Sequence, residues 1–158
     1  MPMNSLAISL LIATQAPAAS PPVAPRLDAR AAQAIVAGCV AHSTGRNQSH
    51  AIAVVDAGGH LLAALRMDGN GYGIMDFALA KAGVVAAWGF PTARMAEAAR
   101  GFGDAPYVVT VGGGVPVWSA DGRERLGAVG VSGEAPADDA ACAEAGIRAA
   151  GLRPARAG

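Results

Sequence analysis

Lys81 is the only lysine in this chain of 158 residues, and its surroundings single it out as a group that could do chemistry. It lies in a mostly apolar run, Ala78 to Val85, where a lone lysine usually reaches the surface along its apolar stem. A salt bridge, or a contact with a carboxylate of a ligand, is the alternative. Any catalytic site would have to be assembled from Lys81 and scattered groups such as Asp56, Arg66 and Asp68.

Three consecutive glycines, Gly112, Gly113 and Gly114, come just before a predicted strand. Such glycines are needed where the backbone takes a positive φ or where another chain or a ligand approaches closely. They therefore form either a strand corner alone or a corner that also borders a ligand site. No Lys-Ser/Thr helix start follows them, and the chain has no nucleophile elbow, dinucleotide fingerprint or HExxH motif. An enzyme is therefore not the favoured interpretation.

Cys39 and Cys142 lie in two predicted helices without a CxxC motif or a metal-ligand spacing. In an oxidising compartment they could form one disulfide, whereas free cysteines are common buried residues in helices. Asp138 and Asp139 follow Pro136 in the first turn of the last helix. Paired carboxylates can bind a cation, but at this position they more often complement the helix dipole.

The elements that must position these residues alternate between helices and pairs of strands. Two strand–turn–strand units, around Gly58-Gly59 and Asp121-Gly122, predict antiparallel pairing. Asp56 precedes the first turn, where its carboxylate can accept local backbone N–H groups. Four helices are predicted. The first covers about 27–42, the second carries Asp76, Lys81 and Trp88, the third covers 93–100 with Thr92 as its N-cap, and the fourth covers about 136–151. The predicted strands are 51–56, 60–67, 115–119 and 126–132.

Composition excludes some functions. The chain carries 12 acidic and 12 basic residues, so it offers no electrostatic footprint for a nucleic acid. With 53% apolar residues it can bury one core, and its length favours a single domain.

Residues 1–20 have the pattern of a secretory signal peptide, although the segment before the apolar run has no Lys or Arg. The apolar run Leu6–Ala13 is followed by Ala16-Pro17-Ala18, which fits a cleavage site, and then by a proline-rich spacer, 21–26. The run is too short to span a bilayer, which needs about 20 apolar residues. We expect a periplasmic or secreted protein whose mature chain begins near Ala19 or Ser20.

Five segments in one order resemble the GlcG/HbpS family of small heme-binding proteins, which contain a DUF336-like domain. They are AIAVVDAGGHLLAALRMDG (51–69), ALAKA (78–82), FPTARM (90–95), GGGVPV (112–117) and GAVGVSGEAPADDAACAEAGI (127–147). The resemblance implies an α/β domain of the α+β type, with a mostly antiparallel five-stranded sheet flanked by helices in a profilin- or roadblock-like layout. It implies a domain over 27–153 with a tail at 154–158, a fifth strand in PYVVTV (106–111) and a homo-oligomer.

The resemblance also implies a flat tetrapyrrole or a small organic molecule as ligand. Heme would need an apolar slot and an axial donor, and the absence of CxxCH predicts non-covalent binding. The candidate donors are His42, His50, His60, Met67, Tyr72 and Tyr107, and the family's Pro-Thr turn adds Thr92. The alternative ligand is a small carboxylate or a corrinoid-like metabolite held by Arg66, Lys81 and the glycine step. A lyase, isomerase or oxidoreductase acting on such a ligand is the least favoured reading.

Overall fold

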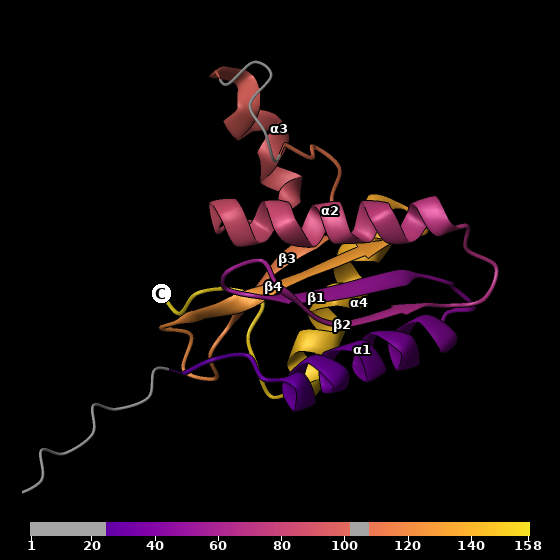
Figure 1. Ribbon diagram of the computed structural model, residues 1–158, viewed down its shortest axis with the longest axis horizontal. Coiled ribbons are helices and arrows are strands. Elements are labelled where there is room, and N and C mark those ends of the chain that lie inside the picture. The colour runs from indigo at the N-terminus through magenta and orange to yellow at the C-terminus, as the bar shows by residue number, and fades with distance from the viewer. Residues whose placement is uncertain (1–24, 102–107) are drawn as a thin grey trace, which may run out of the picture.

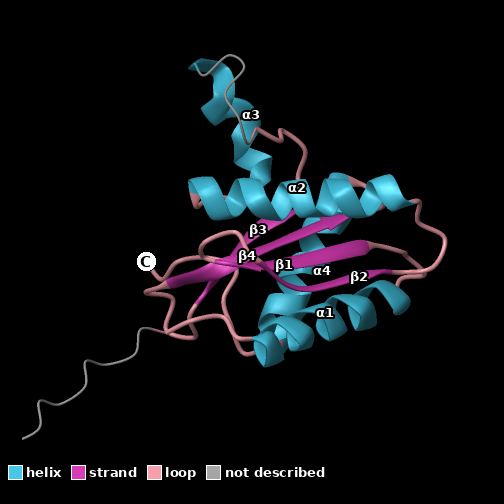
Figure 2. Ribbon diagram, viewed as in Figure 1, coloured by secondary structure: helices cyan, strands magenta, loops and turns pink. Residues whose placement is uncertain are grey.

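The computed structural model describes residues 25–101 and 108–158 of the chain. Four antiparallel strands form one sheet in the order β2-β1-β4-β3. Helices α1 and α4 cover one face and α2 covers the other (Figure 1 and Figure 2). The main elements are α1 (Ala29–Thr44), β1 (Ala51–Asp56), β2 (Leu61–Arg66), α2 (Tyr72–Trp88), β3 (Gly114–Trp118), β4 (Arg125–Ser132) and α4 (Pro136–Ala149).

The two faces of the sheet carry side chains of different size. Ile52 and Val54 of β1, with Val129 and Val131 of β4, pack on α1 and α4 in the main core. The opposite face is built mostly from alanine and glycine, with Val55, so α2 can lie close to the sheet: a Cβ on Gly130 would overlap the carbonyl oxygen of Ala78. This close approach brings the middle of α2 against the sheet.

Local signals in the sequence account for the helix ends. Asp28 caps α1, since its Oδ1 accepts a 2.8 Å hydrogen bond from the N–H of Ala31. Gly89 ends α2 with φ of +83°, a left-handed conformation that glycine adopts at little cost. Pro136 opens α4, where a missing N–H costs nothing, and Asp138 and Asp139 follow in its first turn.

The expected α+β domain with an antiparallel sheet is confirmed, but the expected fifth strand is wrong. The sheet has four strands, and residues 108–113 are not in a strand; residues 106 and 107 lie outside the described part. Gly113 supplies the physical reason. Its carbonyl accepts a 2.9 Å bond from the N–H of Val131, and its φ of +116° then turns the chain away from β4.

The short helix expected over 93–100 is three short pieces that project from the body beside α2 (Figure 1). They are the 3₁₀ turn η1 (Thr92–Arg94), α3 (Met95–Ala98) and the 3₁₀ turn η2 (Ala99–Gly101). Pro91, not Thr92, holds the N-cap position, so the capping role expected for Thr92 is wrong.

Helices α1 and α4 lie against each other and are joined by the disulfide Cys39–Cys142, whose two side chains are fully buried. Gly38 and Gly146 permit the contact, because a Cβ on either would meet the other helix within 3 Å. The bridge spans 103 positions of sequence, so it connects the first helix of the domain to the last.

No single helix in the described part of the chain is long and apolar enough to cross a membrane; α2 and residues Thr92–Ala98 pass that test only as a pair, across a bend of 77°.

The disulfide leads to a first prediction. Unfolding without reductant should expose no free thiol, and reduction should release two. The Cys39→Ala/Cys142→Ala protein should lose up to about 5 kcal/mol of unfolding free energy, as expected for a closed loop of this length. Thiol titration and urea unfolding provide the measurements, and two free thiols in the unreduced protein would contradict the bridge.

Candidate functional site

The fold brings Lys81 into a buried ion pair with Asp139. Lys81 Nζ lies 2.9 Å from Asp139 Oδ2 and donates a 2.8 Å hydrogen bond to the Val131 carbonyl. Both side chains are buried, with exposed fractions of 0% and 2%. The expectation that Lys81 extends to the surface is wrong, and the salt-bridge alternative describes it. The pair connects α2 on one face of the sheet to α4 on the other.

The glycine step makes room for this pair. A Cβ on Gly113 would lie 2.8 Å from Lys81 Nζ and 2.8 Å from the Cβ of Asp139. Gly114 donates its N–H to Thr92 Oγ1 at 2.9 Å, and Gly112 lies against Pro136. All three glycines and Thr92 are buried. The glycine step therefore forms a buried corner before β3, and the Thr92 hydroxyl stabilises this corner by accepting the N–H of Gly114.

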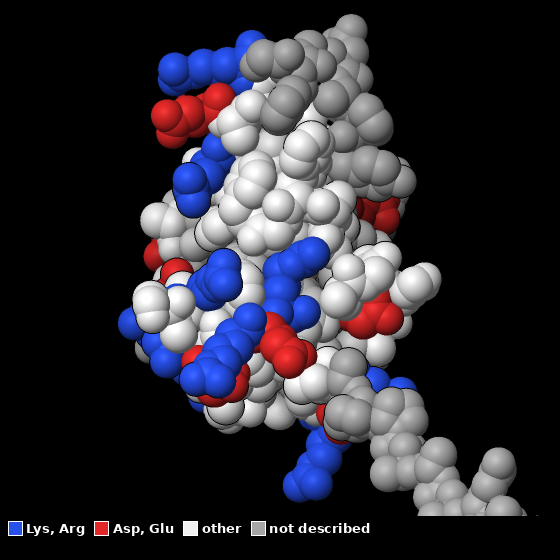
Figure 3. All heavy atoms as spheres, turned by 90° about the vertical axis from the view of Figure 1, so that its left-hand side faces the viewer, with Lys and Arg blue, Asp and Glu red and all other residues white. Residues whose placement is uncertain are grey.

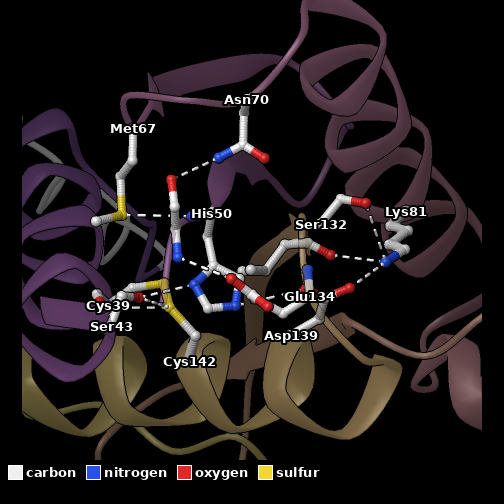
Figure 4. A network of polar contacts seen from close by, with 12 residues as sticks. Cys39, Ser43, His50, Met67, Asn70, Lys81, Ser132, Glu134, Asp139 and Cys142 are labelled. Carbon is white, nitrogen blue, oxygen red and sulfur yellow. Dashed lines mark hydrogen bonds and ion pairs between the residues drawn. A yellow bond between two sulfur atoms is a disulfide. The ribbon is translucent and has the colours of Figure 1, made fainter. Parts of the chain in front are cut away.

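His50 lies between the ion pair and the disulfide (Figure 4). Its Nδ1 is 2.8 Å from Ser43 Oγ, which also lies 2.9 Å from the Cys39 carbonyl oxygen. Its Nε2 is 3.5 Å from Asp139 Oδ1, yet it makes no hydrogen bond in the described structure. A hydroxyl has one proton, so when Ser43 donates to Cys39 the neutral ring of His50 must carry its proton on Nδ1. Nε2 then carries no proton, so it faces the Asp139 carboxylate without a hydrogen to donate.

Burial governs the titration of His50. It lowers the pKa of the ring below 6.5, and the nearby Asp139 carboxylate opposes that shift. The row Ser43, His50 and Asp139 has the residue order of a hydrolytic triad. Ser43 is fully buried, however, and it does not line any of the five main hollows of the described chain. The row therefore holds the fold together and offers no nucleophile to a substrate.

The other two candidate histidines lie apart from this network. His42 Nδ1 is 3.3 Å from an Arg46 nitrogen, and burial lowers the pKa of the ring. His60 is exposed beside Asp56, whose Oδ1 accepts the N–H groups of Gly58 and His60, both at 2.9 Å. The turn role expected for Asp56 is therefore confirmed. The hydrogen bond from the N–H of His60 is the main cause that lowers the pKa of the Asp56 carboxyl, and the bond from Gly58 adds to it. The three histidines do not form one site.

A large apolar hollow lies between α1 and the outer strand β2. It has a volume of about 600 Å³, and only one of its lining side chains is polar. A second hollow, of about 470 Å³, adjoins it at Leu65 and contains Arg66, Met67 and Asp68. We call the two together the α1–β2 trough. The first hollow is lined by Gln33, Val36, Ala37, Val40, Ala41, Leu62, Ala63, Ala64 and Leu65.

Sequence reasoning did not identify the trough as a site. Four apolar residues of the first helix, Ile35, Val36, Cys39 and Val40, have the spacing of one apolar stripe. The stripe divides in the structure: Ile35 and Cys39 enter the core, while Val36 and Val40 also border the trough. No group of three or more His, Cys, Asp or Glu residues that could hold a metal ion occurs within residues 25–101 and 108–158. The trough is thus the described feature best suited to an apolar ligand.

Charged side chains form no comparable feature at the end of the molecule where the C-terminal segment lies. Basic side chains lie among acidic ones on this face (Figure 3), and Arg123 is 3.9 Å from Asp121. This mixed surface agrees with the balanced charge of the sequence.

The titration of His50 predicts how stability depends on pH. Because the folded pKa lies below the unfolded value of 6.5, the unfolded chain takes up the proton first. The free energy of unfolding should therefore fall as the pH is lowered from 7.5 to 5.5, and should fall less in His50→Gln. Urea unfolding at the two pH values measures this. Burial lowers the pKa of His42 as well, so His42→Gln measures that separate contribution to the pH dependence. An equal pH dependence in His50→Gln and the parent would contradict the assignment.

Comparison with solved structures agrees with this fold. The chain has 30% identity to a double mutant of HbpS from Streptomyces reticuli, with a TM-score of 0.69 and coverage of 84% of this chain and 97% of that one. Klebsiella pneumoniae ORFY, a DUF336 protein, gives 25% identity, a TM-score of 0.72 and the same coverage. A PduOC:heme complex gives 22% identity, a TM-score of 0.75, and coverage of 84% and 100%. No curated protein matches the chain.

A family model described as "Haem degrading protein HbpS-like" matches residues 27–148. These residues contain the whole sheet, the disulfide and the Lys81–Asp139 pair. The chain therefore belongs to the HbpS-like family.

Proposed function

We propose that this protein binds heme non-covalently. Membership of the HbpS-like family supports the proposal, as does the fold shared with a protein solved as a heme complex. The α1–β2 trough is the observation that carries it. A flat macrocycle needs an apolar slot that covers much of its surface, and binding pockets for such ligands have volumes of about 300–1,000 Å³. The larger hollow of the trough, at about 600 Å³, lies in that range.

The residues of the trough fit heme in two respects. Alanine, valine and leucine side chains of α1 and β2 form an apolar lining. Arg66, in the adjoining hollow, brings a cation for a propionate. Bound heme would supply an iron centre that takes an axial donor. We propose binding or sensing of heme as the activity that this lining supports.

The alternative ligand, a small carboxylate or corrinoid-like metabolite, loses its main contact. Lys81 is fully buried and its amine is already bonded to Asp139 and Val131. The glycine step is filled by its neighbours, and of the groups expected to hold a carboxylate only Arg66 is exposed. The structure thus offers no observation that favours this second ligand over heme.

We also propose that the protein is exported, as the pattern of residues 1–20 predicts. The disulfide Cys39–Cys142 supports this location, since such bridges persist in oxidising compartments and are rare in the cytosol. An exported protein that binds heme would meet free hemin outside the cytoplasm.

A dimer or larger homo-oligomer is part of the same proposal. Large apolar side chains remain exposed on several elements, among them Leu61 (54%), Tyr72 (84%) and Trp88 (37%). Exposed large apolar side chains are one feature of surfaces that another protein chain covers.

The heme proposal predicts a saturable complex. Hemin added to the purified mature domain should give a sharpened Soret band that saturates at one heme per chain. Bound heme should also raise the melting temperature, because a ligand that binds only the folded state stabilises it. Absorption titration and thermal unfolding test this. An unchanged hemin spectrum, together with stabilisation by small carboxylic acids, would transfer support to the alternative ligand.

Assembly has its own test. Light scattering of the mature domain at micromolar concentration should give at least twice the chain mass. A mass equal to one chain, unchanged between low and high concentration, would contradict the proposed oligomer without affecting the heme proposal.

A further inference from the structure

We infer that the α1–β2 trough recognises the apolar plane of a tetrapyrrole and not its iron, so that a metal-free porphyrin binds about as tightly as hemin. The inference rests on the proposed function and names the part of the ligand that the chain contacts. It departs from the expectation drawn from the sequence, which placed an axial donor for iron in the site.

The hollow between α1 and β2 has a lining without iron ligands. Apart from Gln33, every described residue that lines it is alanine, valine or leucine. The side chains that ligate heme iron are those of histidine, cysteine, methionine and tyrosine. No described residue of these four types lines this hollow. A macrocycle held there would therefore meet no usual iron ligand of the described chain.

The three histidines lie elsewhere. His50 is fully buried, with Nδ1 2.8 Å from Ser43 Oγ. His60 is exposed in the β1–β2 turn, where Asp56 Oδ1 lies 3.2 Å from its Nδ1. His42 has an Nε2 without a hydrogen-bond partner in the described structure, but that atom is buried and the residue lines neither hollow of the trough. The trough thus receives no imidazole.

The sulfur and hydroxyl groups are also bonded to other partners. The sulfur of Met67 accepts the N–H of the fully buried His50 at 3.5 Å, and Met67 borders only the adjoining hollow (Figure 4). Cys39 and Cys142 are bonded to each other. The Thr92 hydroxyl is buried in the corner before β3.

The remaining described donors belong to α2 and α3. Helix α2 covers the face of the sheet opposite to α1 (Figure 1). Tyr72 is exposed at its first position, and Met75 packs against the alanine cluster of that face. Met95 of α3 is fully buried. The described chain thus keeps its iron-binding side chains away from the apolar hollow.

The wall of the hollow suits a flat apolar surface. Ala37 and Ala41 recur at helical spacing on α1, and Ala63 and Ala64 follow each other on β2. An alanine side chain ends at Cβ, so these positions leave space between the longer valine and leucine side chains. Burial of apolar surface favours binding in proportion to the area removed from water. That area is nearly the same for a porphyrin with and without iron.

Hemin and metal-free protoporphyrin are the probes for the test in the full mature domain. Absorption titration measures hemin binding, fluorescence measures protoporphyrin binding, and competition shows whether the two share one site. We expect dissociation constants within about tenfold of each other, because both ligands bury a similar apolar area. Iron ligation by a side chain would instead favour hemin alone.

Variants of α1 and α2 locate the site. Ala37→Glu places a charge on the exposed apolar stripe of α1, and Ala41→Glu, one turn further along, repeats the test. Each should weaken both ligands at least about tenfold, because a carboxylate covered by an apolar ligand loses its hydration. Ala80→Glu, at an exposed position of α2 away from the trough, is the control and should bind as the parent. Circular dichroism and thermal melting establish that each variant is folded.

Other outcomes separate the inference from the proposed function. If hemin binds more than about tenfold tighter than protoporphyrin, the chain ligates iron; the inference is then overturned although heme binding stands. Parental affinities in folded Ala37→Glu and Ala41→Glu would place the ligand outside the trough, with the same consequence. If Ala37→Glu lowers the oligomer mass of the ligand-free protein, a second copy covers the trough and the inference is overturned. If the parent binds neither probe, the proposed function fails and the inference fails with it.

Discussion

The contact between Lys81 and Asp139 determines what the rest of this fold can be. Two charges buried at the sheet stabilise the protein only when they are paired and hydrogen-bonded, because each loses its hydration on burial. The pair meets both conditions: Lys81 also bonds the Val131 carbonyl, and Asp139 Oδ1 accepts the N–H of Glu134. It requires α2 to lie on the sheet, hence the alanines and glycines of that face, and it requires Gly113, whose missing Cβ leaves room for the amine.

This constraint also separates the parts of the molecule that hold it together from the part that can bind. The buried polar groups bond to one another, in a row from the disulfide through Ser43 and His50 to Asp139 and Lys81. What remains open is the apolar trough on the opposite side of α1, with Arg66 and Met67 at its end. An apolar, planar ligand with peripheral carboxylates suits such a surface, and the HbpS-like family to which the chain belongs points to heme.

Much of the fold follows from local patterns. Alternation and turn residues located all four strands within two residues of their ends, and Asp28, Gly89 and Pro136 explain where helices begin or end. The site follows less well, because its contacts join positions far apart in sequence. Nothing local distinguishes an Asp139 that complements a helix dipole from one that meets Lys81 58 positions away. Likewise, a glycine step that is filled by neighbouring side chains has the same sequence pattern as one that borders a ligand. Only the structure, with Thr92 and Lys81 packed around Gly112–Gly114, distinguishes the two.

A double-mutant cycle on the ion pair tests this account most directly. Lys81→Met and Asp139→Leu each leave one buried charge without a partner, so each should lower the free energy of unfolding by about 3–5 kcal/mol. The double variant removes both charges and should be far less destabilised than the sum of the two, with a coupling energy of at least about 2 kcal/mol. Urea unfolding at pH 7.5 supplies the four values. Additive effects, or a fully stable Lys81→Met protein, would show that the two charges do not depend on each other and would contradict the role given to the pair.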